Sequence, residues 1–255
     1  MRGLQGWTSA GPQTAEEMIA EARKAFFVMF GFMVLIWALQ IVNWTGNYQL
    51  DREFEVIPQR PDRLGEIFTA PFLHFSWQHI EGNSGPLFVF GFLAAYRGVV
   101  RFLWLTLLVA LTSGLAVWIF QDTNTGSVGA SGLIFGYFGY VVLRGIFDRR
   151  LIDTLIGVVM AASFAYLVTI ALPGTPGVSW LAHLGGLVGG VVGAWALRDR
   201  RPRIASSADA GSGPGSGLGT GLGSGKTIVP TQGSNPALEG SRSDLHKELG
   251  DLGLL

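Results

Sequence analysis

Long stretches without charge constrain this chain more than any other feature. The hydrocarbon core of a bilayer is about 30 Å thick and is crossed by about 20 apolar helical residues. The sequence predicts six transmembrane helices, at residues 25–42, 74–96, 102–120, 126–143, 155–172 and 178–197. Charged residues make up only 14% of the chain, against roughly a quarter in soluble domains. The composition therefore predicts an all-α membrane protein and excludes an ordinary water-soluble domain.

Lysine and arginine fall mainly on one side of these predicted helices. Short basic loops remain in the cytoplasm. The opposite side carries only Arg52, Arg60 and Arg63, all in the first long loop. The basic residues of the richer side are Arg2, Arg23, Lys24, Arg97, Arg101, Arg144, Arg149, Arg150, Arg198, Arg200, Arg201 and Arg203. Both termini are therefore predicted to be cytoplasmic.

Composition also divides the chain into three parts. Residues 1–24 form a polar, cytoplasmic N-terminal segment, in which 13–24 read as a short interfacial helix opened by a capping box of Thr14 and Glu17. Residues 25–200 hold the six-helix domain. Residues 201–255 are rich in glycine and serine and too poor in apolar residues to fold. We expect this last part to be a disordered cytoplasmic tail.

Charge and cysteine content exclude several functions. The 18 basic and 18 acidic residues balance, which gives no reason to expect a nucleic-acid partner. The chain has no cysteine, so disulfides, thiolate metal sites and a cysteine nucleophile are ruled out. Any covalent chemistry must use another side chain.

Polar residues within apolar helices mark either function or a contact between helices. The second, fourth and sixth predicted helices all enter from the outer face, so their first turns share one depth. The second helix begins with HFSWQHIEGN, which contains His74, His79 and Asn83. The fourth begins with GASG, which contains Ser131, and the sixth with SWLAHLGG, which contains His183. The topology alone thus predicts that a hydroxyl, imidazoles and an amide meet near the outer face.

This set of side chains can perform nucleophilic catalysis. A serine hydroxyl becomes a nucleophile when an imidazole accepts its proton, and the resulting oxyanion needs fixed donors. We predict Ser131 as nucleophile, His183 as base, and His79, Asn83 and the backbone amide of Ser131 as the oxyanion hole. His74 points away from these groups and is expected to brace the loop. No carboxylate lies at a comparable outer position on the fourth or sixth helix, so the sequence predicts a dyad without aspartate.

Glycine supports the same arrangement. Gly129 and Gly132 flank Ser131, and the sixth predicted helix carries small residues at four-residue spacing, which allow close approach of membrane helices. These residues are Gly185, Gly186, Gly189, Gly190 and Gly193. A bulky residue at Gly186 should separate the dyad and abolish activity.

Each residue also has a structural interpretation. Ser131 on its own is more simply a small residue in a glycine-rich helix. His183, His79 and Asn83 could each serve only to hydrogen-bond a neighbouring helix. Their joint occurrence in one layer favours catalysis.

The same residues resemble the rhomboid family of intramembrane serine proteases. GASGLIFGYFGYVVLRG is similar to the family's serine helix, HFSWQHIEGN to its histidine and asparagine helix, and AHLGGLVGG to its general-base helix. The resemblance implies a rhomboid-like bundle with Ser131 and His183 as catalytic residues, and no metal or cofactor. Many members have a tyrosine four residues after the serine; Phe135 here keeps the ring, which could still stack on the base.

The resemblance implies that transmembrane proteins are the substrates and that membrane lipids are the surroundings. Two alternatives remain at this point. A catalytically inactive relative would bind membrane-protein helices without hydrolysis, and a small transporter would use the polar layer as a path. The sequence favours a multi-pass protein of a bacterial plasma membrane, and it gives no oligomeric state.

Overall fold

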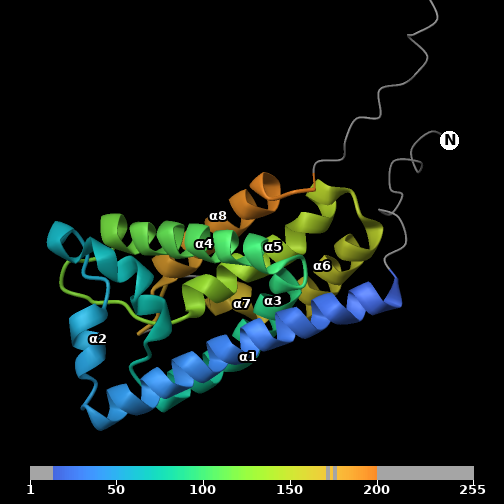
Figure 1. The fold of residues 1–255 in the computed structure, drawn as a ribbon. Coiled ribbons are helices and arrows are strands. Elements are labelled where there is room, and N and C mark those ends of the chain that lie inside the picture. The colour runs from blue at the N-terminus through green and yellow to red at the C-terminus, as the bar shows by residue number, and fades with distance from the viewer. Residues whose placement is uncertain (1–13, 171–172, 175–176, 200–255) are drawn as a thin grey trace, which may run out of the picture. The chain divides into compact units, whose positions relative to one another are not determined.

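Helices make up almost all the regular structure in the described part of the chain. The computed structural model describes residues 14–170, 173–174 and 177–199, so the predicted disordered tail at 201–255 lies outside the described residues. The elements are α1 (Ala15–Thr45), α2 (Gln49–Phe54), the 3-10 helices η1 (Pro61–Phe68) and η2 (Ala70–Phe72), α3 (Trp77–Ala95), α4 (Val99–Phe120), α5 (Ser131–Asp148), α6 (Leu151–Ser163), α7 (Tyr166–Ile170) and α8 (Trp180–Ala196). The all-helical prediction is confirmed for these residues (Figure 1).

The first helix is longer than the sequence predicted. The capping box is present, since Thr14 accepts from the Glu17 amide and the Glu17 carboxylate accepts from the Thr14 amide. The helix then continues without interruption from Ala15 to Thr45. The prediction of a separate interfacial helix at 13–24 was therefore wrong. Residues 15–24 are good helix formers with no glycine or proline, so nothing stops the helix before the apolar stretch.

Other predicted helices also have different limits. The second was predicted to begin at His74, but α3 begins at Trp77 after the N-cap Ser76, so His74 lies in the segment before the helix. The fourth was predicted to begin at 126, but α5 begins at Ser131, because residues 126–130 are held in an extended loop and Gly129 has a φ of 126°. The fifth was predicted as one helix over 155–172, but the chain turns between α6 and α7, at Phe164 and Ala165. Hydropathy is similar on both sides of this turn and so could not reveal it.

Helix α8 packs tightly between α4 and α5, and glycine makes this possible (Figure 1). One glycine stripe faces α5: a β-carbon at Gly186 would lie 2.1 Å from the carbonyl oxygen of Gly132. The adjacent stripe faces α4: a β-carbon at Gly185 would lie 2.6 Å from the carbonyl oxygen of Thr112. Since real β-carbons do not come so close, larger residues at either stripe would push the helices apart. The close packing predicted from the glycine spacing is therefore observed.

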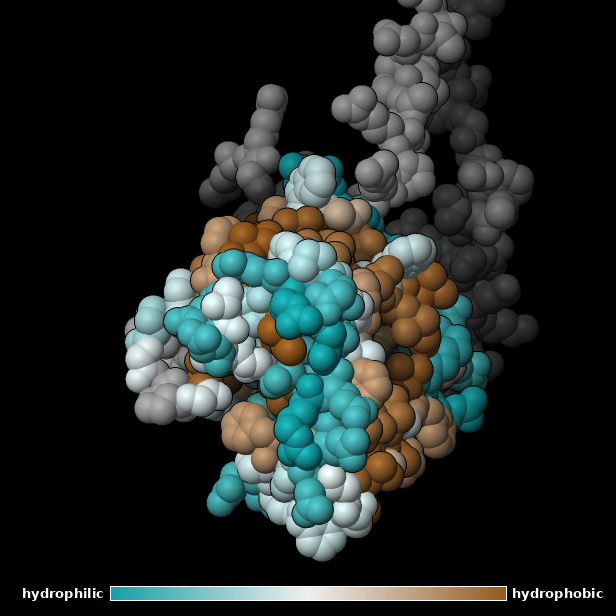
Figure 2. Space-filling model, turned by 90° about the vertical axis from the view of Figure 1, so that its left-hand side faces the viewer, coloured by the Kyte–Doolittle hydropathy of each residue, from teal (hydrophilic) through white to brown (hydrophobic). Residues whose placement is uncertain are grey.

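Apolar side chains cover much of the helical surface. Among the described helices, α1 and α4 are long and apolar enough to cross a bilayer, while α6 and α8 are apolar but shorter. Large side chains on α1 and α4 are more than half exposed, including Phe27, Val100 and Trp104. The end of the bundle that carries α2 differs, because hydrophilic residues gather there (Figure 2). A polar end and apolar flanks suit a protein that lies in a membrane with this end in water.

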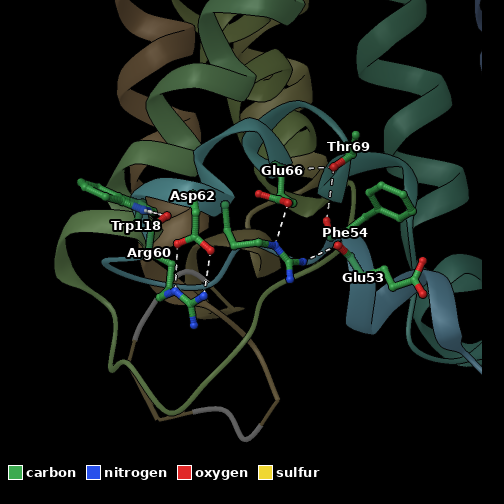
Figure 3. Close-up of polar contacts among 8 residues, drawn as sticks. Glu53, Phe54, Arg60, Asp62, Glu66, Thr69 and Trp118 are labelled. Carbon is green, nitrogen blue, oxygen red and sulfur yellow. Dashed lines mark hydrogen bonds and ion pairs between the residues drawn. The ribbon is translucent and has the colours of Figure 1, made fainter.

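The segment between α1 and α3 is held by a polar network (Figure 3). Arg63 donates to the Glu66 carboxylate over 2.7 Å and also to the backbone carbonyl of Glu53 in α2. The hydroxyl of Thr69 donates to the carbonyl of Phe54. From α4, the indole of Trp118 donates to the carbonyl of Arg60 over 3.1 Å. These bonds fix α2 and η1 against the end of the bundle.

Candidate active site

The loop that precedes Ser131 is pinned by backbone and imidazole hydrogen bonds. Ser127 and Val56 form an antiparallel bridge, with N–H to O distances of 3.0 and 3.1 Å. The amide of Gly129 donates to the carbonyl of Ala70 over 3.0 Å. The next amide, that of Ala130, donates to Nε2 of His74. Three positions in this loop are thus held by the segment from 56 to 74, which fixes the backbone where α5 begins.

Ser131 and His183 line the same cavity. Ser131 is the first residue of α5, so its own amide lies in the first helical turn and has no acceptor within the helix. His183 lies in the first turn of α8 and is almost fully buried. The ring of Phe135, one turn after Ser131, stacks on His183 with the centroids 4.2 Å apart and the planes at 19°. This stacking restricts the imidazole while leaving its nitrogens at its edge.

Two nitrogen atoms of α3 lie at the same cavity. His79 and Asn83 are one turn apart and both line it. The Asn83 amide nitrogen is buried and has no hydrogen-bond partner among the described residues; the same holds for Nδ1 of His79. The hydroxyl of Ser76 caps α3 by accepting from the His79 amide. Buried polar groups normally have partners, so an unpaired donor such as the Asn83 amide is available for a ligand oxygen.

His79 also has tightly packed surroundings. A β-carbon at Gly129 would lie 2.5 Å from the His79 ring, and the φ of Gly129 is one that other residues rarely adopt. The rings of Phe75 and His74 contact it on other sides, with centroids 4.3 and 5.0 Å away. His74 itself is fully buried and accepts from the Ala130 amide, so it contacts the loop as expected. Its ring also contacts His79, so the prediction that it points away from that residue was wrong.

Ser113 on α4 contacts the residues beside Ser131 and His183, and sequence reasoning missed it. Its hydroxyl donates to the carbonyl of Ala182, the residue before His183, over 2.9 Å. A β-carbon added at Gly132 would lie only 2.1 Å from the Oγ of Ser113, so only glycine fits at position 132. Gly132, Ala182 and Ser113 therefore bring three helices together directly beside Ser131. A serine in an apolar helix carried no signal that would have distinguished it from a packing residue.

The site comprises a large cavity of about 840 Å³ and a smaller one of about 210 Å³. Both are lined by four predicted site residues: Ser131, His183, His79 and Asn83. The smaller cavity lies between α3, α5 and α7, and is closed by Tyr166 and Leu167 of α7 on one side. The larger cavity extends toward α2 and the loop that carries Gln121.

Sequence reasoning also missed two carboxylates of the larger cavity, Asp51 and Glu55. Asp51 lies in α2 and Glu55 directly follows that helix, in a region whose structure the hydropathy pattern does not predict. Within the described residues, no group of three or more metal-binding side chains is placed to hold a metal ion.

The fold and the cavity define a helical membrane protein with a polar pocket at one end of its bundle. The chain belongs to the rhomboid family, because the family's Rhomboid domain model matches residues 61–200. An uncharacterized protein of Mycobacterium tuberculosis is 34% identical over 192 residues, which cover 71% of this chain and 80% of that protein. Rhomboid-like protein 11, chloroplastic, of Arabidopsis thaliana is 33% identical over 145 residues, 52% of each chain. A putative rhomboid protease of Bacillus subtilis is 28% identical over 125 residues, 49% of this chain and 62% of the relative.

Proposed function

We propose that this protein is an intramembrane serine endopeptidase that hydrolyses peptide bonds in or near transmembrane segments of other membrane proteins. The observation that carries the proposal is one cavity lined by Ser131, His183, His79 and Asn83, with a buried unpaired donor on Asn83. Membership of a family that includes a putative rhomboid protease supports it. No metal or cofactor takes part in the proposed reaction.

In the proposed reaction, His183 accepts the hydroxyl proton of Ser131 while Oγ attacks the scissile carbonyl carbon. The carbonyl oxygen becomes an oxyanion, which accepts hydrogen bonds from Asn83, His79 and the Ser131 amide. The C–N bond then breaks, and His183 returns the proton to the leaving amine. Water attacks the acyl-enzyme ester by the same route, which releases the acid and restores Ser131. The stacking of His183 on Phe135 orients the imidazole ring.

We further propose that six membrane crossings are made by α1, α3, α4, α5, α6 with α7, and α8. Both termini lie in the cytoplasm, residues 25–200 form the protease domain, and residues 201–255 form a cytoplasmic tail. The hydrophilic end around α2 then faces the exterior (Figure 2). Water reaches Ser131 through the larger cavity that this residue lines. A substrate helix reaches the smaller cavity between α3 and α7 and unwinds there. Unwinding is required because the hydrogen bonds of a helix shield the scissile amide from attack. Two cytoplasmic termini and a compact six-helix core favour a bacterial plasma membrane.

A fluorophosphonate probe tests the enzyme class directly. The full chain in detergent should be labelled covalently at Ser131, and Ser131→Ala should remove the label. The same preparations should be tested for cleavage of a model transmembrane substrate, with Ser131→Ala as the blank. Labelling that survives in Ser131→Ala would refute the assignment of the nucleophile. A chain that binds the substrate but shows neither labelling nor cleavage would instead be an inactive rhomboid-like protein.

A further inference from the structure

The larger cavity carries a pronounced local charge in a chain whose net charge is zero. Asp51 and Glu55 line it, and none of the described residues that line it is lysine or arginine. The other lining groups include His79 and His183, with neutral side chains around them. The two carboxylates therefore give one side of this cavity an acidic lining, while their arginine neighbours, Arg52 for Asp51 and Arg63 for Glu55, lie outside it.

The buried member of this pair has an unsatisfied oxygen. Asp51 is only 7% exposed, and its Oδ1 accepts a hydrogen bond from the Asn43 amide over 2.8 Å. Its Oδ2 is buried without a hydrogen-bond partner among the described residues. A buried carboxylate oxygen that lacks a partner is costly, so a donor that enters the cavity would be stabilised there.

The pair is held close to the catalytic loop. The carbonyl oxygen of Asn43 accepts from the amide of Tyr48, and its side-chain oxygen accepts from the amide of Leu50, so α2 is fixed to the end of α1. The carboxylate of Glu55 occupies the space where a side chain at Gly126 would have to be. The next residue, Val56, bridges to Ser127, four positions before Ser131. The acidic pair is thus part of the same rigid unit as the nucleophile.

The chemistry of the cavity indicates which cation fits. A calcium ion takes six to eight oxygen ligands. The cavity offers two carboxylates, which are too few to coordinate such an ion well. A lysine or arginine side chain needs only a few acceptors and arrives attached to a peptide. On the proposed function, a substrate chain bound at Ser131 also adjoins this cavity, because Ser131 lines both the smaller and the larger one.

We propose that Asp51 and Glu55 form a subsite that selects substrates with a lysine or arginine side chain near the scissile bond. This inference rests on the proposed protease function and names a substrate class for it. Lysine and arginine are rare on the outer side of membrane helices, because basic residues favour the cytoplasmic side. The subsite would therefore restrict cleavage to a minority of membrane proteins.

The test is a substrate series in which one lysine is moved through the positions on either side of the scissile bond, with glutamine at the same position as the reference. Wild-type protein should cleave the best lysine substrate with a kcat/KM about 10-fold above its glutamine counterpart, as expected for a charge-assisted hydrogen bond. The combined change Asp51→Asn and Glu55→Gln should bring this ratio close to one. Glu53→Gln, on the exposed side of the same helix, should keep it.

Charge reversal provides an independent check. Glu55→Lys should change the preference so that a substrate with glutamate at the best position is cleaved faster than its lysine counterpart. Fluorophosphonate labelling of Ser131 verifies that each variant is folded, because it does not depend on the substrate's charge. Cleavage at equal rates with lysine and glutamine by wild-type protein would overturn the subsite and leave the protease function intact. An absence of both labelling and cleavage in wild-type protein would overturn the protease function, and the subsite with it.

Discussion

The sharpest test of the geometry is a single methyl group at Gly186. This residue faces Gly132 across the contact between α8 and α5, one helical turn from His183. The new β-carbon of Gly186→Ala would lie 2.1 Å from the Gly132 carbonyl oxygen, whereas ordinary contact begins at 3.4 Å. The helices must therefore separate locally by about 1.3 Å, the difference between these distances. A misplacement of about 1 Å at a reacting pair costs about 100-fold in rate.

We expect Gly186→Ala to lower both kcat/KM for a model transmembrane substrate and the rate of fluorophosphonate labelling by about 100-fold. Gly186→Val, with two more carbons, should abolish both. Gly31→Ala in α1 is the matched control, since the same methyl group meets nothing within 4 Å there. Gly185→Ala, which faces Thr112 on α4 instead of α5, should lower stability but cost less in rate.

The reasoning would be refuted if folded Gly186→Ala protein were labelled as fast as wild type. That result would mean that α8 and α5 can separate without moving Ser131 from His183. Gel filtration and helical circular dichroism of each variant show whether a loss of rate reflects local displacement or unfolding.

Three further predictions concern stability. Asp153 forms ion pairs with both Arg97 and Arg144, whose side chains are largely buried. Asp153→Asn should therefore lower the free energy of unfolding in detergent by about 3 kcal/mol. An unchanged free energy of unfolding would contradict the ion-pair network. Burial raises the pKa of Asp51 to about 6, so its charge is penalised above that pH and the penalty disappears as the pH falls toward about 4. Thermal unfolding should therefore show Asp51→Asn to be more stable than wild type by up to about 3 kcal/mol at pH 7.5, and by only about 1 kcal/mol at pH 4.5. A difference that does not change with pH would be evidence against a raised pKa. Ser113→Ala removes the hydrogen bond to the Ala182 carbonyl. It should lower the free energy of unfolding by about 1 kcal/mol and kcat/KM by a few-fold. Full activity would show that Ser113 does not position α8.

Much of the helical framework could be predicted because hydropathy and glycine spacing are local signals. The capping box of Thr14 and Glu17 and the glycine stripe of α8 both took the expected form. The polar layer was predicted from topology, and the structure brings Ser131, His183, His79 and Asn83 to one cavity.

The remainder depended on contacts between distant parts of the chain. The extended loop before Ser131 is held by Val56, Ala70 and His74, which no local pattern connects to it. In the sequence, Asp51 and Glu55 look like ordinary charged residues of a loop. Their place at the cavity follows only from the position of α2 in the folded chain. The turn between α6 and α7 occurs within a continuous apolar stretch, where composition does not report on backbone direction.

The two glycine stripes of α8 also limit how this protein can move. The glycines of α8 contact the backbones of α4 and α5 on two sides, where there is no room for a larger side chain. Rotation or sliding of α8 would move Leu184 or Leu187 into these contacts and is therefore blocked. Helices α4, α5 and α8 must therefore travel as one rigid body. On the proposed protease function, an opening for a substrate would therefore come from helices outside this group, among which α6 and α7 are already separated by a turn.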